Sequence, residues 1–169
     1  MAAGATYTPI ATQTISGSSV ASVTFSSIPS TYTDLILVAQ LKTASTAGDL
    51  VMQFNSDTGT NYSRTVLYGT GSAAGSSRES SVAQITIDNY GTPSSTEAAM
   101  DIIQIMNYAN TTTYKTVLAR ANKAGSGVDA TVGLWRSTSA INSILLKVIT
   151  NTVNIAVDST FTLYGIVAA

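Results

Sequence analysis

The clearest pattern of hydrophobic and polar positions lies in Thr33–Thr43, which reads T-D-L-I-L-V-A-Q-L-K-T. Three leucines and an alanine alternate onto one face, while the other face is apolar at Ile36 and Val38 and turns polar at Gln40. Alternation with period two indicates a β-strand, and apolar residues on both faces indicate a central strand that leaves a core towards solvent. A helix is the competing interpretation, but turn residues on both sides bracket a length that suits a strand better.

Similar short segments, separated by residues that favour turns, follow one another along the whole chain. Besides 33–43, we expect strands over residues 7–15, 20–25, 49–55, 62–68, 82–88, 97–108, 114–123, 128–136, 141–149 and 161–167. The last two are the expected sheet neighbours of the central strand, and Pro9, which cannot donate to a ladder, places the first at a sheet edge. Ten or eleven strands without a clear helix predict an all-β fold, an antiparallel β-sandwich of jelly-roll type.

The segment Glu97–Tyr108 fits this pattern least well. Met100, Ile103 and Met106 recur every three residues, as they would on one side of a helix. The β-branched isoleucines and the asparagines that follow favour a long strand with a bulge instead.

The length of 169 residues suits a single domain, which we place at residues 7–169 behind an N-terminal arm at residues 1–6. Residues 69–81, G-T-G-S-A-A-G-S-S-R-E-S-S, lack large apolar side chains and are expected to form an exposed loop that a neighbouring chain orders. Later in the chain, Gly133 is expected to let the indole of Trp135 lie across the backbone.

Composition narrows the possible functions. Charged residues make up 10% of the chain, against about 25% in an average protein, and the net charge is −1. The charges are scattered singly, so we expect no nucleic-acid partner and no anionic membrane surface. The chain has no cysteine, and it has no histidine, the commonest general base. We therefore expect no enzyme, cofactor or metal, although carboxylate catalysis and a calcium site made by loop carboxylates stay open.

Targeting signals are also missing from the sequence. The N-terminus lacks a basic stretch followed by an apolar stretch, and no apolar run approaches the roughly 20 residues that span a bilayer. We expect a soluble protein that is made in a cytoplasm and has no membrane partner.

The triplet Asp57-Thr58-Gly59 is the motif that carries the catalytic carboxylate of aspartic proteases. Those enzymes need two such carboxylates that share a proton, and this chain has one copy of the triplet. Asp-Thr-Gly is also an ordinary hairpin turn, which is the interpretation we favour.

Several tyrosines fall near predicted turns, where they suit saccharide stacking, a protein interface or the closure of a sandwich end. The candidate partner contacts combine these tyrosines with the arm and the 69–81 loop: Tyr7, Tyr62, Tyr68, Arg78, Glu79, Tyr90 and Tyr114.

Four stretches together carry a resemblance: residues 28–35, 54–63, 133–138 with Ile141 and Ile144, and 159–166. Their sequences are I-P-S-T-Y-T-D-L, F-N-S-D-T-G-T-N-Y-S, G-L-W-R-S-T and S-T-F-T-L-Y-G-I. In this order they resemble small virion structural proteins of tailed bacteriophages, of the decoration, head-fibre and tail-fibre types. The shared motifs are turn and strand signatures that span most of the chain.

The resemblance implies a β-sandwich that sits on a viral shell or forms trimers. The first expectation is a virion protein, made in the host cytoplasm, that binds the major capsid protein as decoration or cement and stabilises the shell. The alternative is a tail-fibre or receptor-binding module for a host saccharide, and a carbohydrate-active enzyme or free lectin is a third. Low surface charge and faces rich in Thr, Ser and Ala lead us to expect a homo-oligomer, with a trimer favoured.

Overall fold

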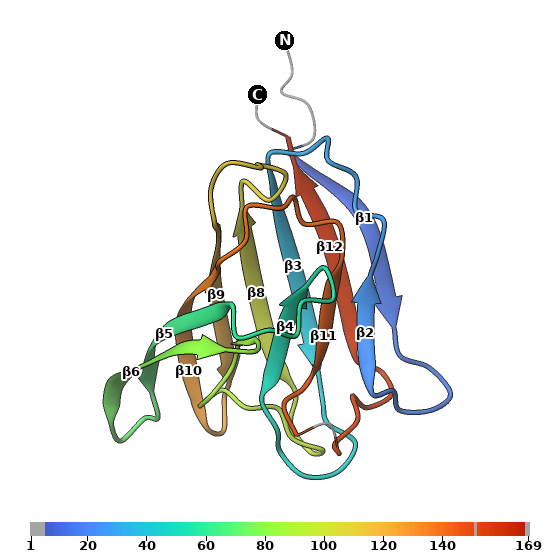
Figure 1. Cartoon of the computed structure of the whole chain (residues 1–169). Helices are drawn as coiled ribbons and strands as arrows, with labels where there is room; N and C mark the ends of the chain where they lie inside the picture. Colours follow the sequence, from blue (N-terminus) through green and yellow to red (C-terminus); the bar gives the residue numbers. More distant parts are fainter. Residues whose placement is uncertain (1–5, 151, 168–169) are drawn as a thin grey trace.

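The computed structural model describes residues 6–150 and 152–167, and in these residues it contains twelve strands and no helix. The strands form two antiparallel sheets that pack face to face as a sandwich (Figure 1). Their bounds are β1 (Tyr7–Thr14), β2 (Ser22–Phe25), β3 (Asp34–Leu41), β4 (Leu50–Phe54), β5 (Tyr62–Gly69), β6 (Ala74–Val82), β7 (Ile85–Thr86), β8 (Ala99–Met106), β9 (Lys115–Lys123), β10 (Gly127–Trp135), β11 (Ile144–Val148) and β12 (Thr160–Ile166). The predicted all-β sandwich is thereby confirmed, and residues 1–5 of the predicted arm lie outside the described residues.

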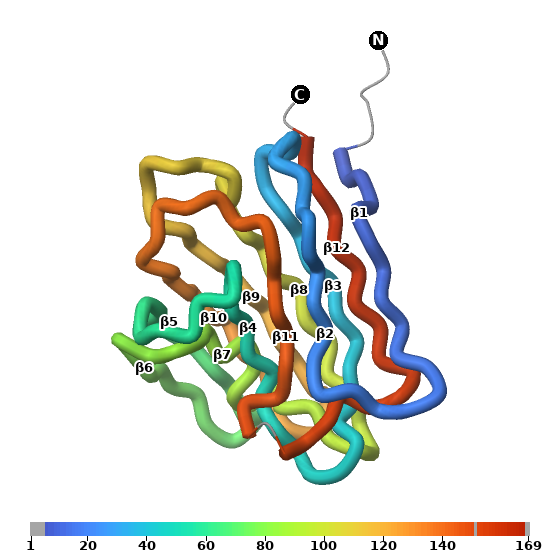
Figure 2. The backbone as a smooth tube through the Cα atoms, turned by 45° about the vertical axis from the view of Figure 1, so that its right-hand side comes forward, coloured from blue at the N-terminus to red at the C-terminus, as the bar shows by residue number. Residues whose placement is uncertain are grey.

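The two sheets differ in size. The large sheet has the order β1-β12-β3-β8-β9-β10-β5-β6, and the small sheet has the order β2-β11-β4-β7. Figure 2 shows β2, β11 and β4 lying over the large sheet, whose β1 and β12 run side by side from one end of the molecule. Tyr7 pairs with Ile166, so the two ends of the described chain are neighbours in one ladder.

The stretch around Leu37 is the central strand that its pattern predicts. As β3 it lies between β12 and β8, and its leucines and alanine on the inner face are at most 1% exposed. The predicted neighbour 161–167 is confirmed as β12, and β1 is an edge strand as Pro9 indicated. The predicted neighbour 141–149 is wrong, because β11 belongs to the small sheet, where it pairs with β2 and β4. The alternation of apolar and polar residues shows which face of a strand is buried, but it does not show which strand pairs with it in the sheet.

The ambiguous segment forms strand β8, not a helix. Its residues alternate between buried and exposed from Ala99 to Met106, and its pairing with β3 and β9 runs without a register shift, so the expected bulge is absent from this strand. Ile103 points into the core while Met100 and Met106 lie on the opposite, outer side. The spacing of three therefore reflects a strand that is apolar on both faces.

The prediction of a loop over 69–81 is wrong for most of its length. Residues Ala74–Val82 form edge strand β6, which pairs with β5, and only the turn before them is irregular. The segment is nevertheless exposed, as expected. A β-ladder is held by hydrogen bonds between backbone groups. The unpaired backbone edge of β5 therefore holds β6 as a strand, although the side chains of β6 are mostly polar and exposed.

The expectation for Gly133 is also wrong. A Cβ at this position would lie 2.8 Å from two side-chain atoms of Ile85, so the glycine makes room for Ile85 on β7. The Trp135 indole instead packs against Phe54 and stacks with Tyr62, at centroid distances of 5.5 Å and 6.3 Å. Among the described residues, no helix is long and apolar enough to cross a membrane.

Candidate functional site

Asp57 serves as a structural turn residue. Its carboxylate accepts hydrogen bonds from the backbone N–H of Gly59 at 2.8 Å, from Asn61 at 2.9 Å and from the Trp135 indole N–H at 2.7 Å. Burial raises the pKa of Asp57, but these three donors outweigh it and leave the pKa below its usual value. The geometry favours the turn interpretation of Asp-Thr-Gly, since the carboxylate is committed to fixing the β4–β5 connection.

Three aspartates lie between the sheets and are almost fully buried: Asp88, Asp101 and Asp129. Asp88 accepts one bond from the Leu50 N–H at 2.6 Å, and both carboxyl oxygens of Asp101 have no hydrogen-bond partner among the described residues. Burial, reinforced by the charge of Asp129, raises the pKa of Asp101 to about 8. Burial and the neighbouring Asp101 also raise the pKa of Asp88 well above its usual value.

These aspartates do not form a metal centre. Within the described part of the chain, no three His, Cys, Asp or Glu side chains are arranged to hold a metal ion. A carboxyl group in such surroundings is stable in its neutral, protonated form. Asp101 therefore carries a proton at neutral pH and is a buried acid inside the core.

Asp129 has a different role from its two neighbours. One of its carboxylate oxygens accepts the backbone N–H groups of Asn89, Tyr90 and Gly91 at 3.0, 2.9 and 2.7 Å. The carboxylate thus shapes the loop after β7 and holds Tyr90 in place.

Tyr90 and Tyr68, both half-buried, form a stacked aromatic pair among the predicted contacts. Their rings stack at a centroid distance of 3.6 Å with an interplanar angle of 14°. A Cβ at Gly75 would lie 2.6 Å from the Tyr68 hydroxyl oxygen, so Tyr68 lies between the β6 backbone and Tyr90. Tyr68 thus covers one face of the Tyr90 ring, and Tyr90 as a whole is half-buried.

The prediction for Tyr62 is wrong. This tyrosine is fully buried, and its hydroxyl accepts from the Phe54 N–H at 3.0 Å and donates to the Asp57 carbonyl at 3.0 Å. Its position next to a predicted turn gave no sign of this burial. In the structure the ring points inward from the first residue of β5 and closes one end of the core.

The other predicted contacts are exposed but dispersed. Tyr7 lies on edge strand β1, with an edge-on contact to Tyr164, and Tyr114 lies in the connection between β8 and β9. Arg78 and Glu79 lie on edge strand β6. Tyr7 and β6 thus lie at opposite edges of the large sheet, so the predicted contacts do not form one site.

A polar cleft of about 510 Å³ lies beside Glu79, between β6 and the small sheet. Its buried Arg64 donates to Glu79 at 2.7 Å and to Asn89 at 2.6 Å. Asp49 also lines the cleft, and burial raises its pKa while a hydrogen bond from Thr92 and the charge of Arg64 oppose the rise. The guanidinium is already matched by a carboxylate, so the cleft has little net charge with which to attract an ionic ligand.

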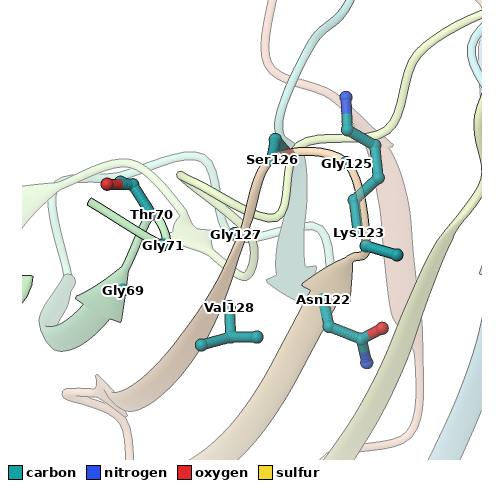
Figure 3. A pocket seen from close by; sticks show the side chains of 10 residues that line it. Gly69, Thr70, Gly71, Asn122, Lys123, Gly125, Ser126, Gly127 and Val128 are labelled. Atoms are coloured by element: carbon teal, nitrogen blue, oxygen red, sulfur yellow. The ribbon is translucent and has the colours of Figure 1, made fainter. Parts of the chain in front are cut away.

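A second hollow, of about 530 Å³, lies between the turn after β5 and the β9–β10 turn. Figure 3 shows that Lys123 extends to the opposite side from Asn122 and Val128, and that much of the lining is glycine backbone. Its polar side chains do not converge on one point, so it is poorly suited to hold a small ligand.

The most extensive surface feature is the side of the large sheet that faces away from the small sheet. We call it the outer face, and its exposed apolar side chains are Leu67, Met100, Ile102, Met106, Leu118, Val128 and Val132. Each is between 37% and 62% exposed. This surface was not predicted from the sequence, although the apolar residues on both faces of Ala99–Met106 are its signal, since such strands are typical of sheets covered on both sides.

Comparisons of the chain with protein-family models, with curated proteins and with solved structures found no match.

Proposed function

We propose that this chain is a non-enzymatic structural protein of a bacteriophage virion, and that it acts there as a decoration or cement protein on the capsid. The observation that carries the proposal is the outer face. The largest apolar patch of a small protein is often functional, and this one suits a component that works in contact with other chains. The rigid sandwich, including the jelly-roll type that we retain as part of the proposal, would supply the scaffold.

The edge strand β6 is the part of the molecule that we assign to the major capsid protein. An edge strand presents unpaired backbone N–H and C=O groups that another chain can join, and Arg78 and Glu79 add charges that can select the partner. A cement protein stabilises a shell through buried area between subunits and needs no reactive group. The protein would be made in the host cytoplasm and reside in the mature virion.

The proposal is tested on the particles of the virus that encodes this chain. We expect quantitative mass spectrometry of purified heads to find the chain in a fixed ratio to the major capsid protein. Heads assembled without it should release their DNA at a lower temperature, and added purified protein should restore the original temperature. Purified heads and tails that contain none of the chain would contradict the proposal.

A second candidate function is supported by Tyr90. In this alternative the half-buried Tyr90 ring, with Tyr68 stacked on one side, would bind the apolar face of a sugar ring in a receptor-binding module. Here Tyr90→Ala should abolish binding on a glycan array or to host cells, while Tyr114→Ala, also an exposed tyrosine, should leave it unchanged. Absence of any glycan or host-cell signal from the parent protein rules this candidate out.

A further inference from the structure

We infer that the outer face of the large sheet is covered by the outer face of a second copy of this chain. The inference deepens the proposed function, and it rests on the role of this face as an assembly surface, not on a position in the virion. Its basis is the continuity, the charge and the size of the surface.

The apolar side chains of the outer face are neighbours across adjacent strands. The register places Leu118 opposite Val132 on the β9–β10 pair and Leu67 opposite Ala130 on the β10–β5 pair. On the other side, Ile102 is opposite Val38 of β3. Directly opposed residues lie about 5 Å apart on the same face. On the central β8–β9 pair Met100, Ile102 and Met106 are opposite Asn122, Arg120 and Thr116, so there the patch continues only through diagonal neighbours such as Ile102 and Leu118.

Charge is sparse on the central strands of this surface, although Arg78 of β6 lies opposite Thr65 on the same face. At the outward positions of β8, β9 and β10, which are described in full, Arg120 is the single charged residue. Interface centres lose Lys, Glu and Asp but are enriched in Met and Arg, as here with Met100, Met106 and Arg120. A surface that remained in water would carry more charge than this.

The size of the patch fits a specific interface. Its seven half-exposed side chains offer apolar area on the order of 500 Å², which by itself does not exceed the largest patch of an ordinary monomer, about 300–600 Å² and often functional. With the polar positions among them, Gln104, Thr116 and Asn122, the surface approaches the roughly 800 Å² per partner of a stable complex.

A second copy is the occupant that the surface chemistry favours. In an isologous contact the same patch lies on both partners. Such a contact suits an apolar surface, because a patch with many charges of one sign would need a partner of the opposite sign. Two extended sheets can also pack face to face at about 30°, as the two sheets within one chain do, which would continue the layers of the sandwich. Because each outer face is used once in such a contact, the assembly closes as a dimer.

The first experiment measures the mass of the purified chain by light scattering across micromolar concentrations. We expect the mass of two chains, and we expect Leu118→Asp to weaken association by about 100-fold or more, because a buried, unpaired carboxylate is strongly unfavourable. Ser22→Asp, an exposed strand position of the small sheet, is the matched control and should associate like the parent. A monomeric parent, or a folded Leu118→Asp variant that associates as the parent does, overturns the inference.

A second measurement remains informative if Leu118→Asp fails to fold. The chain has no cysteine, so a thiol from Val132→Cys or from the control Ser22→Cys is the only one present. We expect maleimide labelling at position 132 to slow by about tenfold or more as protein concentration rises, while labelling at position 22 stays constant. Equal labelling of both at every concentration overturns the inference, as does protection of position 132 that appears only on addition of purified capsids. If the chain associates with itself but is absent from purified particles, the proposed virion role is refuted and the inferred contact between two copies is not.

Discussion

Asp57 illustrates how one side chain can decide a local structure and also mislead a functional interpretation. The Asp-Thr-Gly triplet suggests a catalytic carboxylate, but its oxygens bind the donors of its own turn and of Trp135 on a distant strand. The turn could be predicted from the sequence. The bond to Trp135 could not, because it joins residues 78 positions apart.

Replacement of Asp57 by alanine should lower the free energy of unfolding by about 2 kcal/mol, since it leaves the nearly buried indole N–H of Trp135 without a partner. Urea titration followed by Trp135 fluorescence measures the change. Thr58→Ala, at the exposed neighbouring position, is the control and should have little effect. An unchanged midpoint for Asp57→Ala would show that the hydrogen bond contributes nothing.

Asp101 makes stability depend on pH in an unusual direction. Its pKa is about 8 in the folded protein and near 3.8 in an unfolded chain, so between these values the folded state holds a proton that the unfolded state has lost. The free energy of unfolding should therefore fall as pH rises from about 4 to 8, by at most about 1.4 kcal/mol per unit. The raised pKa of Asp88 acts in the same direction.

Asp101→Asn should remove much of this slope and should stabilise the protein at pH 8, because the amide stays neutral. Denaturant titrations at several pH values measure both effects, and Asp158→Asn, at an exposed turn, is the control. Stability that is constant, or that increases, from pH 4 to 8 in the parent would contradict the assignment of a protonated Asp101.

At the scale of elements, the contact between β10 and β7 shows what a glycine in a strand can accomplish. Gly133 lies on the inner face of the large sheet, where the side chain of Ile85 from the small sheet fills the space above it. The sequence showed a glycine beside a tryptophan and suggested the wrong neighbour. The neighbour is decided by the packing of two sheets, which no local pattern contains.

Gly133→Ala should destabilise the protein by about 1–3 kcal/mol, because its Cβ would press on the fully buried Ile85. In the double variant with Ile85→Ala, the two losses should sum to more than the measured loss, with a coupling of about 1 kcal/mol. Gly69→Ala, whose Cβ would meet nothing closer than 3.7 Å, is the control. Strict additivity in thermal or chemical unfolding would exclude the proposed contact.

β6 is the element that the sequence described least well. Its composition of Gly, Ser, Arg and Glu resembles a linker, and its exposure was predicted correctly. Its strand conformation comes from the ladder with β5, and a ladder forms between backbones whatever the side chains are.

At the scale of the whole molecule, the pairing of β1 with β12 joins the first and last described strands of the chain. Such a contact closes a loop of nearly the full chain length, and non-local pairing of this kind slows folding. A circular permutant should therefore keep the fold and fold faster. In this permutant the two original chain ends are joined, and the new ends are made between Gly17 and Ser18. These two residues lie in an exposed turn, and there is open space around the glycine.

Circular dichroism and stopped-flow refolding measure both outcomes. We expect an unfolding free energy close to that of the parent and a higher folding rate, since the β12–β1 contact becomes a local hairpin. A permutant opened within β3, which should not fold, is the control for a cut in an essential strand. Failure of the Gly17–Ser18 permutant to fold would show that the chain connection between β1 and β2 is itself required.

The hydrophobic pattern alone predicted that the chain is all-β, where most strands lie and which side of the central strand 33–43 is buried. It could do so because a strand repeats every two residues, and this period is visible in neighbours along the chain. Only the tertiary structure decided the sheet membership of β11, the burial of Tyr62, the meeting of Asp88 with Asp101, and the extent of the outer face. Each depends on residues far apart in sequence, which hydrogen-bond ladders and sheet packing bring together.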